Sequence, residues 1–359
     1  MRFGGIKSDF QWQMGYTVSR NVHQGGLFMC TSISFFEPAL FGRNLDLEYS
    51  FGEQVVVTPR EYPFSFHYRP DMIRHFAMIG MASVAKNVPL YAEAANEKGL
   101  YMAGLNFPSN AWYFPDVDDD RENVAPYELI PLVLGTCATL VQARRLLENI
   151  RLISKPFAEG YPLAPLHWHI ADATGSLVAE PREDGLRIYE DPVGVMTNNP
   201  PFPFQLMNLN NYQSLSARPP ENRFSQALDL QIYGQGMGAL GLPGDTSPMS
   251  RFVRAAFLKE NAVMTGEPEE KVNQFFHILE GVSMVRGTVI TPEGKYDETT
   301  YSCCIDAGSG IYYYKTYDNS QISAVSMFEE NLDTSALIAY PLTRGPQIHF
   351  VNKGGQVGQ

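Results

Sequence analysis

Cysteine is scarce in this chain of 359 residues, which contains only Cys30, Cys137, Cys303 and Cys304. So few cysteines in so long a chain do not make a disulfide framework. Cys303 and Cys304 are adjacent, and a bond between them would be severely strained. The thiols are therefore expected to stay reduced, which favours a reducing cytoplasm as the compartment.

Long apolar runs are also missing. No segment approaches the ~20 apolar residues of a membrane-spanning helix, and the first 28 residues lack the apolar stretch of a secretory signal. Acidic residues outnumber basic ones by 39 to 27, which gives a formal net charge of −12. This balance argues against nucleic acid or an anionic membrane as a general partner. A small anionic substrate stays possible, because a pocket needs only local positive charge.

Several common chemical signatures are absent or incomplete. No Gly-x-Ser-x-Gly elbow occurs, which removes the commonest serine hydrolase interpretation. The string from Gly236 to Gly241 matches a dinucleotide fingerprint, but Pro243 follows too soon for a helix to open on its glycines. His167 and His169 alternate on a predicted strand, but no second ligand pair accompanies them, so core histidines are favoured over zinc ligands. No metal site is predicted.

What the chain does contain suits a globular protein with a sizeable core, since 44% of its residues are hydrophobic and 18% are charged. There is no repeat, linker or break in composition. Helical patterns occur twice within 126–150 and again at 251–262 and 269–279, and 209–245 is an Asn-, Gly- and Pro-rich loop. Strand patterns occur at 30–36, 54–58, 76–82, 100–105, 166–170, 176–180, 186–189, 193–196, 285–290, 299–305, 311–316 and 322–325, and a turn is expected at 93–99. This order predicts one α+β domain with mostly antiparallel sheet.

Cys30 is the most informative residue, because it follows an internal methionine and begins a strand-like run. Methionine before a small residue is commonly removed, which would make Cys30 the N-terminal residue. Its free α-amine would have an unperturbed pKa of about 7.7–8.0, low enough to accept a proton from a thiol whose reference value is about 8.5. A nearby arginine would favour the thiolate, and a carboxylate would orient the ammonium. Arg43 and Asp46 are placed to return beside Cys30 across a short turn. A small buried hydrophobe is the alternative reading of the cysteine.

The residues before Met29 are interpreted as a leader. Gln24-Gly25-Gly26 can be encoded by codons that contain AGGAGG, a purine-rich ribosome-binding sequence, just upstream of the Met29 codon. We therefore expect residues 1–29 to be a leader or an over-called start that is absent from the mature enzyme, and residues 30–359 to form a single domain. A genuine propeptide or fusion remnant is the alternative.

From Met29 to about residue 345 the chain resembles the choloylglycine hydrolase family, which contains bile salt hydrolases and penicillin V acylases among the N-terminal nucleophile hydrolases. The resemblance rests on Met29-Cys30-Thr31, Phe41-Gly42-Arg43-Asn44-Leu45-Asp46, Asn96-Glu97-Lys98-Gly99-Leu100, Ala103-Gly104-Leu105-Asn106-Phe107-Pro108, Leu166-His167-Trp168, Thr197-Asn198-Asn199-Pro200, Gly241-Leu242-Pro243-Gly244-Asp245 and Ser250-Arg251-Phe252. It implies a four-layer αββα sandwich with two antiparallel sheets between helix layers, commonly assembled as a homotetramer.

The resemblance also implies a role for each site residue. Cys30 would be the nucleophile and its α-amine the proton acceptor, with Asp46 holding the ammonium and Arg43 favouring the thiolate. Asn106 and Asn198 would polarise the scissile carbonyl and stabilise the oxyanion. From the residues alone, both asparagines are better explained as turn formers. Arg251 would complete the polar shell. No metal or organic cofactor is needed.

The implied substrate is a conjugated bile salt, cleaved at the amide that joins the bile acid to glycine or taurine. Asparagine at position 106, where the penicillin V acylase branch often carries tyrosine, favours the bile salt branch. A steroid needs an apolar slot, for which the candidates are Leu45, Tyr49, Phe51 and Phe157, with ordinary core as their alternative. A penicillin V or other N-acyl amide hydrolase and, if residues 1–29 are retained, a catalytically silent bile-acid binder remain as rival hypotheses.

Overall fold

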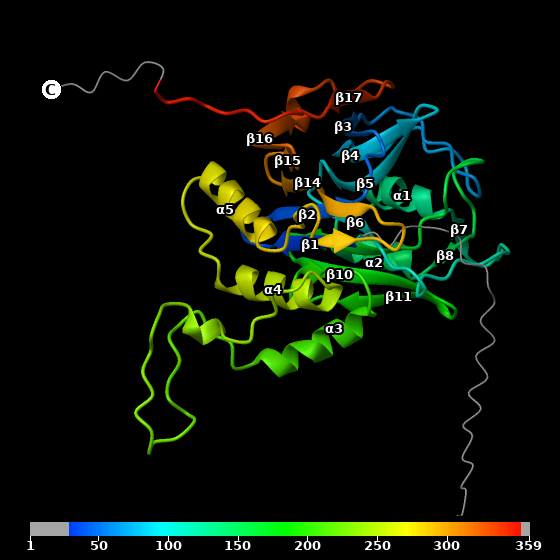
Figure 1. Cartoon of the computed structure of the whole chain (residues 1–359). Coiled ribbons are helices and arrows are strands. Elements are labelled where there is room, and N and C mark those ends of the chain that lie inside the picture. Colours follow the sequence, from blue (N-terminus) through cyan, green and yellow to red (C-terminus); the bar gives the residue numbers. More distant parts are fainter. Residues whose placement is uncertain (1–28, 353–359) are drawn as a thin grey trace, which may run out of the picture.

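The computed structural model describes residues 29–352, so the expected leader over residues 1–28 lies outside the described residues. Two antiparallel sheets form the body of the molecule (Figure 1). The seven-stranded sheet has the order β12 (Val195–Met196), β1 (Met29–Phe35), β2 (Leu40–Leu47), β14 (Tyr296–Asp306), β15 (Ile311–Thr316) and β16 (Asn319–Ser326), with β13 (Val289–Ile290) paired to β14. The eight-stranded sheet has the order β11 (Gly185–Glu190), β10 (Gly175–Arg182), β9 (Leu166–Asp172), β6 (Tyr101–Asn106), β5 (Val88–Asn96), β4 (Met78–Ala85), β3 (Glu53–Thr58) and β17 (Ile338–Pro341).

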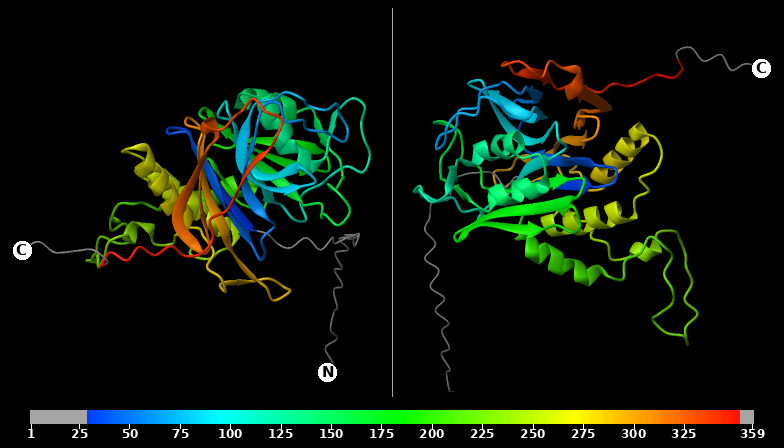
Figure 2. Two further views of the ribbon diagram at one scale, coloured as in Figure 1. Left: turned by 90° about the horizontal axis from the view of Figure 1, so that it is seen from above. Right: turned by 180° about the vertical axis from the view of Figure 1, so that it is seen from behind.

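Helices cover the outer face of each sheet. α1 (Leu129–Thr136) and α2 (Leu140–Leu147) contact the eight-stranded sheet through β5, β6, β9 and β10. α4 (Pro248–Asn261) and α5 (Pro268–Glu280) contact the seven-stranded sheet through β1, β2 and β14, on the opposite side of the molecule (Figures 1 and 2). The predicted four-layer αββα sandwich is confirmed. No helix among residues 29–352 is long and apolar enough to cross a membrane.

The layering explains why the central strands are buried on both faces. All residues of β2 and β6 are buried, as are all but the first residue of β1. A strand covered by a second sheet on one face and by helices on the other excludes water from both. Any polar residue in these strands must therefore find a partner inside the protein, and β1 and β2 contain several.

Most of the predicted strands and helices are present, although the first and last residues of many of them differ from the prediction. Thr139 caps α2, because its hydroxyl accepts a hydrogen bond from the Gln142 backbone amide at 3.3 Å. The predicted strand at 285–290 was too long, since only Val289–Ile290 is a strand.

The turn predicted at 93–99 was wrong over its first half, because β5 continues to Asn96 and only the following residues turn. Its polar side chains suggested a loop. In the structure the Asn96 side chain donates to the carbonyls of Leu134 and Cys137 at the end of α1, at 2.7 and 2.8 Å. These buried bonds satisfy a polar residue inside a strand. β17 and the helix α3 (Phe202–Leu209) were not predicted.

Candidate active site

Cys30 is the second residue of β1, and the alternation of side chains along β1 and β2 determines its neighbours. Cys30 lies opposite Leu45, and Ser32 lies opposite Arg43. Directly opposed residues and residues two apart point to the same face of a sheet. Ser32 Oγ is 2.8 Å from Nδ1 of His169 in the other sheet, so this shared face lies between the two sheets. Cys30 and Arg43 are thus brought together in the interior.

The Arg43 guanidinium is completely buried and is held mainly by backbone carbonyls. Nη1 donates to the carbonyls of Gly104 at 2.6 Å and Ala92 at 3.3 Å, and it forms an ion pair of 3.7 Å with Glu93. Nη2 is buried and has no hydrogen-bond partner among the residues that the structure describes. Arg43 and Cys30 line the same cavity, which brings the positive charge near the sulfur.

Asp46 and Thr31 lie on the opposite face of the same strands, toward α4 and α5. Asp46 Oδ1 accepts a hydrogen bond of 2.6 Å from the Thr299 hydroxyl, whereas Oδ2 is buried without a hydrogen-bond partner among residues 29–352. Arg251 on α4 donates Nη1 to the Cys30 carbonyl and, at 2.6 Å, to the Thr31 hydroxyl. The backbone of Cys30 is therefore held from the helix side of the sheet.

The two predicted asparagines occupy different positions around Cys30. The Asn198 side chain accepts from the Cys30 backbone N–H at 2.9 Å and from Arg251 Nη2 at 2.7 Å, and it donates to the Asn106 carbonyl at 2.8 Å. Asn106 is at the end of β6 and belongs to the described lining of the cavity, whereas Asn198 does not. Asn198 therefore lies at the nitrogen of Cys30, and Asn106 lies on the side of the cavity.

Burial controls the ionisation of these groups. It raises the pKa of the Cys30 thiol above its usual value, although the positive charge of Arg43 acts in the opposite direction. Burial also raises the pKa of Asp46 to about 6, against the lowering effects of Arg251 and of the bond from Thr299. The charged forms of both acids are disfavoured because they have lost contact with water. The thiol therefore needs a neighbouring base in order to react as thiolate.

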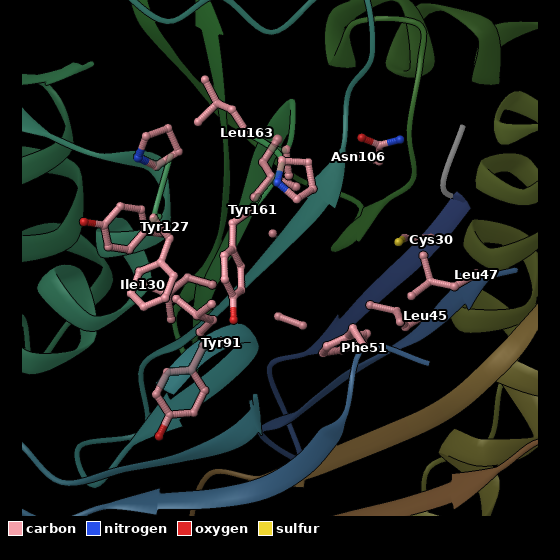
Figure 3. A pocket seen from close by; sticks show the side chains of 18 of the residues that line it. Cys30, Leu45, Leu47, Phe51, Tyr91, Asn106, Tyr127, Ile130, Tyr161 and Leu163 are labelled. Atoms are coloured by element: carbon pink, nitrogen blue, oxygen red, sulfur yellow. The ribbon is translucent and has the colours of Figure 1, made fainter. Parts of the chain in front are cut away.

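A cavity of about 250 Å³ opens beside the sulfur. Figure 3 shows Cys30 and Asn106 at one end of it and Tyr91, Tyr127 and Ile130 at the other. Most of the remaining lining is apolar or aromatic. The cavity thus combines a small polar end at the cysteine with a long apolar compartment, which suits a ligand of the same character.

All four residues predicted to bind substrate line this cavity, namely Leu45, Tyr49, Phe51 and Phe157. The Phe157 ring lies edge-on to the rings of Tyr127 at 5.3 Å and Tyr161 at 5.1 Å. The residues that sequence reasoning missed include Tyr91, Tyr127, Ile130, Tyr161 and Leu163. Tyr161 and Leu163 belong to the same Pro- and Gly-containing loop as Phe157, and that loop was the one available signal for them.

The histidine pair belongs to the packing around the site. His167 and His169 are buried, and His167 Nε2 is 2.9 Å from the carbonyl of Thr197, the residue before Asn198. Within the described residues no group of three or more histidine, cysteine or acidic side chains is arranged to hold a metal ion.

Two sheets between helix layers, with a cysteine at the head of an inner strand beside a cavity, define the architecture of the N-terminal nucleophile hydrolases. Residues 30–340 match the family model described as linear amide C–N hydrolases, choloylglycine hydrolase family. The chain belongs to this family.

Curated relatives and solved structures agree with that assignment. The chain is 48% identical over 325 residues to the "Bile salt hydrolase/transferase" of Lactiplantibacillus plantarum, covering 90% of this chain and 100% of the relative. It is 33% identical over 316 residues to the "Conjugated bile acid hydrolase" of Lactobacillus acidophilus, covering 87% and 100%. The crystal structure of a mutant conjugated bile acid hydrolase from Clostridium perfringens superposes with a TM-score of 0.83 at 36% identity and covers 91% of this chain and 100% of that one. A penicillin V acylase from Agrobacterium tumefaciens, 22% identical, has the same fold with a TM-score of 0.69, over 88% and 92% of the two chains.

Proposed function

We propose that this protein hydrolyses conjugated bile salts at the amide bond that joins the bile acid to glycine or taurine. The observation that carries the proposal is the position of Cys30 at the polar end of an apolar cavity. An amphipathic steroid conjugate has the matching distribution of polar and apolar groups. Relatives at 48% and 33% identity that are named for this activity support the same substrate class.

The reaction proceeds through a thioester. The α-amine of Cys30 takes the thiol proton, and the sulfur attacks the amide carbonyl to form a tetrahedral oxyanion. The C–N bond then breaks as the leaving amine takes a proton from the α-ammonium. Water then attacks the thioester carbonyl while the α-amine takes one of its protons. The C–S bond breaks as the α-ammonium gives that proton to the departing sulfur, which releases the bile acid and the free thiol. Asn106 and Asn198 would polarise the carbonyl and stabilise the oxyanion. Asn106 borders the cavity, and Asn198 also accepts from the backbone N–H of Cys30.

This mechanism requires the removal of residues 1–29, which we also propose. The family match begins at residue 30, and 90% of this chain covers the full length of the Lactiplantibacillus plantarum relative. The buried Oδ2 of Asp46 has no hydrogen-bond partner among residues 29–352, and Met29 pairs directly with Asp46 across the strands. An ammonium group at Cys30 would supply the donor that this oxygen lacks.

Two measurements test the function. The first compares release of glycine from glycocholate with hydrolysis of penicillin V, and we expect a clear preference for glycocholate. A preference for penicillin V would instead assign the penicillin V acylase reaction to the same residues. The second is the intact mass of the active protein, which we expect to correspond to a chain that starts at Cys30. A chain that starts at Met1 and lacks hydrolysis would support the silent binder.

We further propose that the enzyme assembles as a homotetramer in the cytoplasm. Residues 213–235 leave the body of the molecule as a long excursion (Figure 1) and expose several large apolar side chains, among them Phe224, Leu228, Leu230, Ile232 and Tyr233. Exposed apolar groups of this number mark a contact surface. Cys30, Cys137, Cys303 and Cys304 are all free thiols, as a reducing compartment would keep them.

A further inference from the structure

Glu93 is a completely buried carboxylate that the reaction described above does not use. It lies on β5 of the eight-stranded sheet, yet its hydrogen-bond donors come from the other sheet. Oε1 accepts from the Tyr312 hydroxyl at 2.6 Å and from the Cys303 thiol at 3.6 Å, and Oε2 accepts from the Tyr301 hydroxyl at 2.7 Å. Glu93 therefore joins β5 to β14 and β15 across the interior.

Burial raises the pKa of Glu93 above its usual value, whereas the charge of Arg43 and the hydrogen bonds from Tyr312, Tyr301 and Cys303 act in the opposite direction. These neighbours favour the ionised carboxylate, because a carboxylate accepts hydrogen bonds and is attracted to a positive charge. The Arg43 guanidinium lies with Nη1 at 3.7 Å from Oε2. An isolated buried charge is very costly, and a buried pair with its hydrogen bonds filled is much less so. Glu93 and Arg43 thus form one buried ion pair.

Arg43 links this pair to the cysteine. Its Nη1 is occupied by carbonyls of β5 and β6, and Nη2 is left without a hydrogen-bond partner among residues 29–352. Arg43 and Cys30 line the same cavity, and the charge of Arg43 lowers the pKa of the thiol. A guanidinium is planar. Holding Nη1 with two carbonyls and the Glu93 carboxylate therefore also determines the direction of Nη2.

We propose that Glu93 is a positioning residue for the reaction: as the counter-ion of Arg43, it holds the guanidinium beside the sulfur of Cys30. The inference rests on the proposed function. A misplacement of about 1 Å in such a group can cost about 10²-fold in rate. Glu93 would act only through Arg43, and this gives the proposal its test.

The central variant is Glu93→Gln, which keeps the shape and removes the charge. We expect kcat for glycocholate to fall by roughly 10- to 100-fold with KM little changed. In an Arg43→Gln background the same substitution should have almost no further effect, because its route to the sulfur is already lost. The proposal is wrong if Glu93→Gln keeps full kcat. It is also wrong if the loss of kcat in the double variant equals the product of the losses in the two single variants.

The rate of Cys30 alkylation by iodoacetamide, measured against pH, is a second readout that does not depend on bile salt hydrolysis. Arg43 is the main charge that lowers the pKa of the Cys30 thiol. Loss of its placement should therefore move the alkylation profile of Glu93→Gln to higher pH, by the same amount as Arg43→Gln. An unchanged or lowered profile would overturn the proposal even if the wild-type protein proved to act on another substrate.

Glu97→Gln is the matched control. Glu97 lies just beyond the end of β5 and accepts from Arg60 and from the Ala77 backbone at 3.1 Å, away from the cavity that holds Cys30. It should leave kcat and the alkylation profile unchanged. If Glu93→Gln does not fold, Tyr312→Phe removes one donor and keeps both charges. It should lower kcat a few-fold in the wild-type background and not in Arg43→Gln, and an unchanged kcat would contradict the proposal.

Discussion

At the scale of single residues, the site is built around Cys30, and its polar neighbours come from both faces of the seven-stranded sheet. Arg43 reaches it from the interior between the sheets, and Asp46 and Arg251 lie on the helix side. The division follows from strand alternation alone, because residues 43 and 46 are an odd number of positions apart on β2. The sequence spacing therefore determines which face each charge occupies.

The clearest residue-scale prediction concerns the nucleophile. Cys30→Ala should lower kcat for glycocholate by on the order of 10⁴-fold or more while the far-UV circular dichroism spectrum stays unchanged. The side chain is small and buried, so its replacement by alanine leaves the packing nearly intact. Substantial hydrolysis in this variant would assign the nucleophile to another group.

A second residue-scale prediction uses the pH dependence of stability. In the chain that retains its N-terminal extension, burial raises the folded-state pKa of Asp46 to about 6, and burial together with Asp46 and Glu48 raises that of Asp297 to about 7. Both values lie above that of an unfolded aspartate, about 3.9. The folded state then binds more protons between these values, so the contribution of the two aspartates to stability is greatest below about pH 4 and is lost as pH rises to their folded-state pKa values of about 6 and 7.

Removal of the extension should change this dependence. An ammonium group beside Asp46 favours its charged form and lowers its pKa. Thermal unfolding measured from pH 5 to 8 should therefore show a steeper loss of stability for the full 359-residue chain than for a chain expressed from Met29. Identical profiles, with mass spectrometry showing that the two chains differ, would argue against an ammonium–Asp46 contact.

At the scale of elements, the loop that walls the cavity is held at one end by a tyrosine. The Tyr113 hydroxyl donates to the Ala164 carbonyl at 2.9 Å and accepts from the Leu166 amide at 2.8 Å. Ala164 and Leu166 line the cavity, as do Phe157 and Tyr161 earlier in the same loop. One side chain therefore fixes the point where the loop enters β9.

Tyr113→Phe should raise KM for glycocholate more than it lowers kcat, because the variant loosens the cavity wall and leaves the Cys30 surroundings intact. Two backbone groups lose their partner, and each such loss costs about 1–3 kcal/mol when the group stays buried. Steady-state kinetics and a thermal melt measure both effects. A fall in kcat at constant KM would place Tyr113 in a different role.

The elements also show where sequence reasoning succeeds and where it stops. Cys30, Arg43 and Asp46 could be grouped from the sequence because they lie on two strands joined by a short turn. Asn198 and Arg251 come from 168 and 221 positions away and were placed only through the family resemblance. No local pattern contains that information, since the contact depends on how the whole chain folds.

The missed elements have the same cause. β17 is short and acquires strand structure by pairing Ile338 with Val57, far away in the chain. α3 begins among prolines, which mark the end of the preceding strand but are also well suited to the first turn of a helix. Tyr91 and Ile130 reach the cavity from a strand and a helix whose sequences indicate only burial.

At the scale of the whole molecule, the excursion over residues 213–235 is the feature least explained by one copy of the chain. Phe224 and Tyr233 are each 84% exposed there. Replacing both by serine should reduce the molar mass measured by light scattering after gel filtration, from that of the proposed tetramer to that of smaller species. A matched change at Ile73, which is 72% exposed on a different part of the surface, should leave the mass unchanged. Equal masses for all three proteins would exclude the excursion from assembly.

The two-faced arrangement around Cys30 has a consequence for how the enzyme can be altered. Burial raises the pKa of the Cys30 thiol, which is lowered by Arg43 in the interior and by Arg251 on the helix side and raised further by the charge of Asp46. Charges on both faces of the sheet therefore act on the same sulfur. A substitution of Asp46 or Arg251 in the helix layer is expected to change the reactivity of the attacking atom as well as the surroundings of its nitrogen, so the two cannot be adjusted independently.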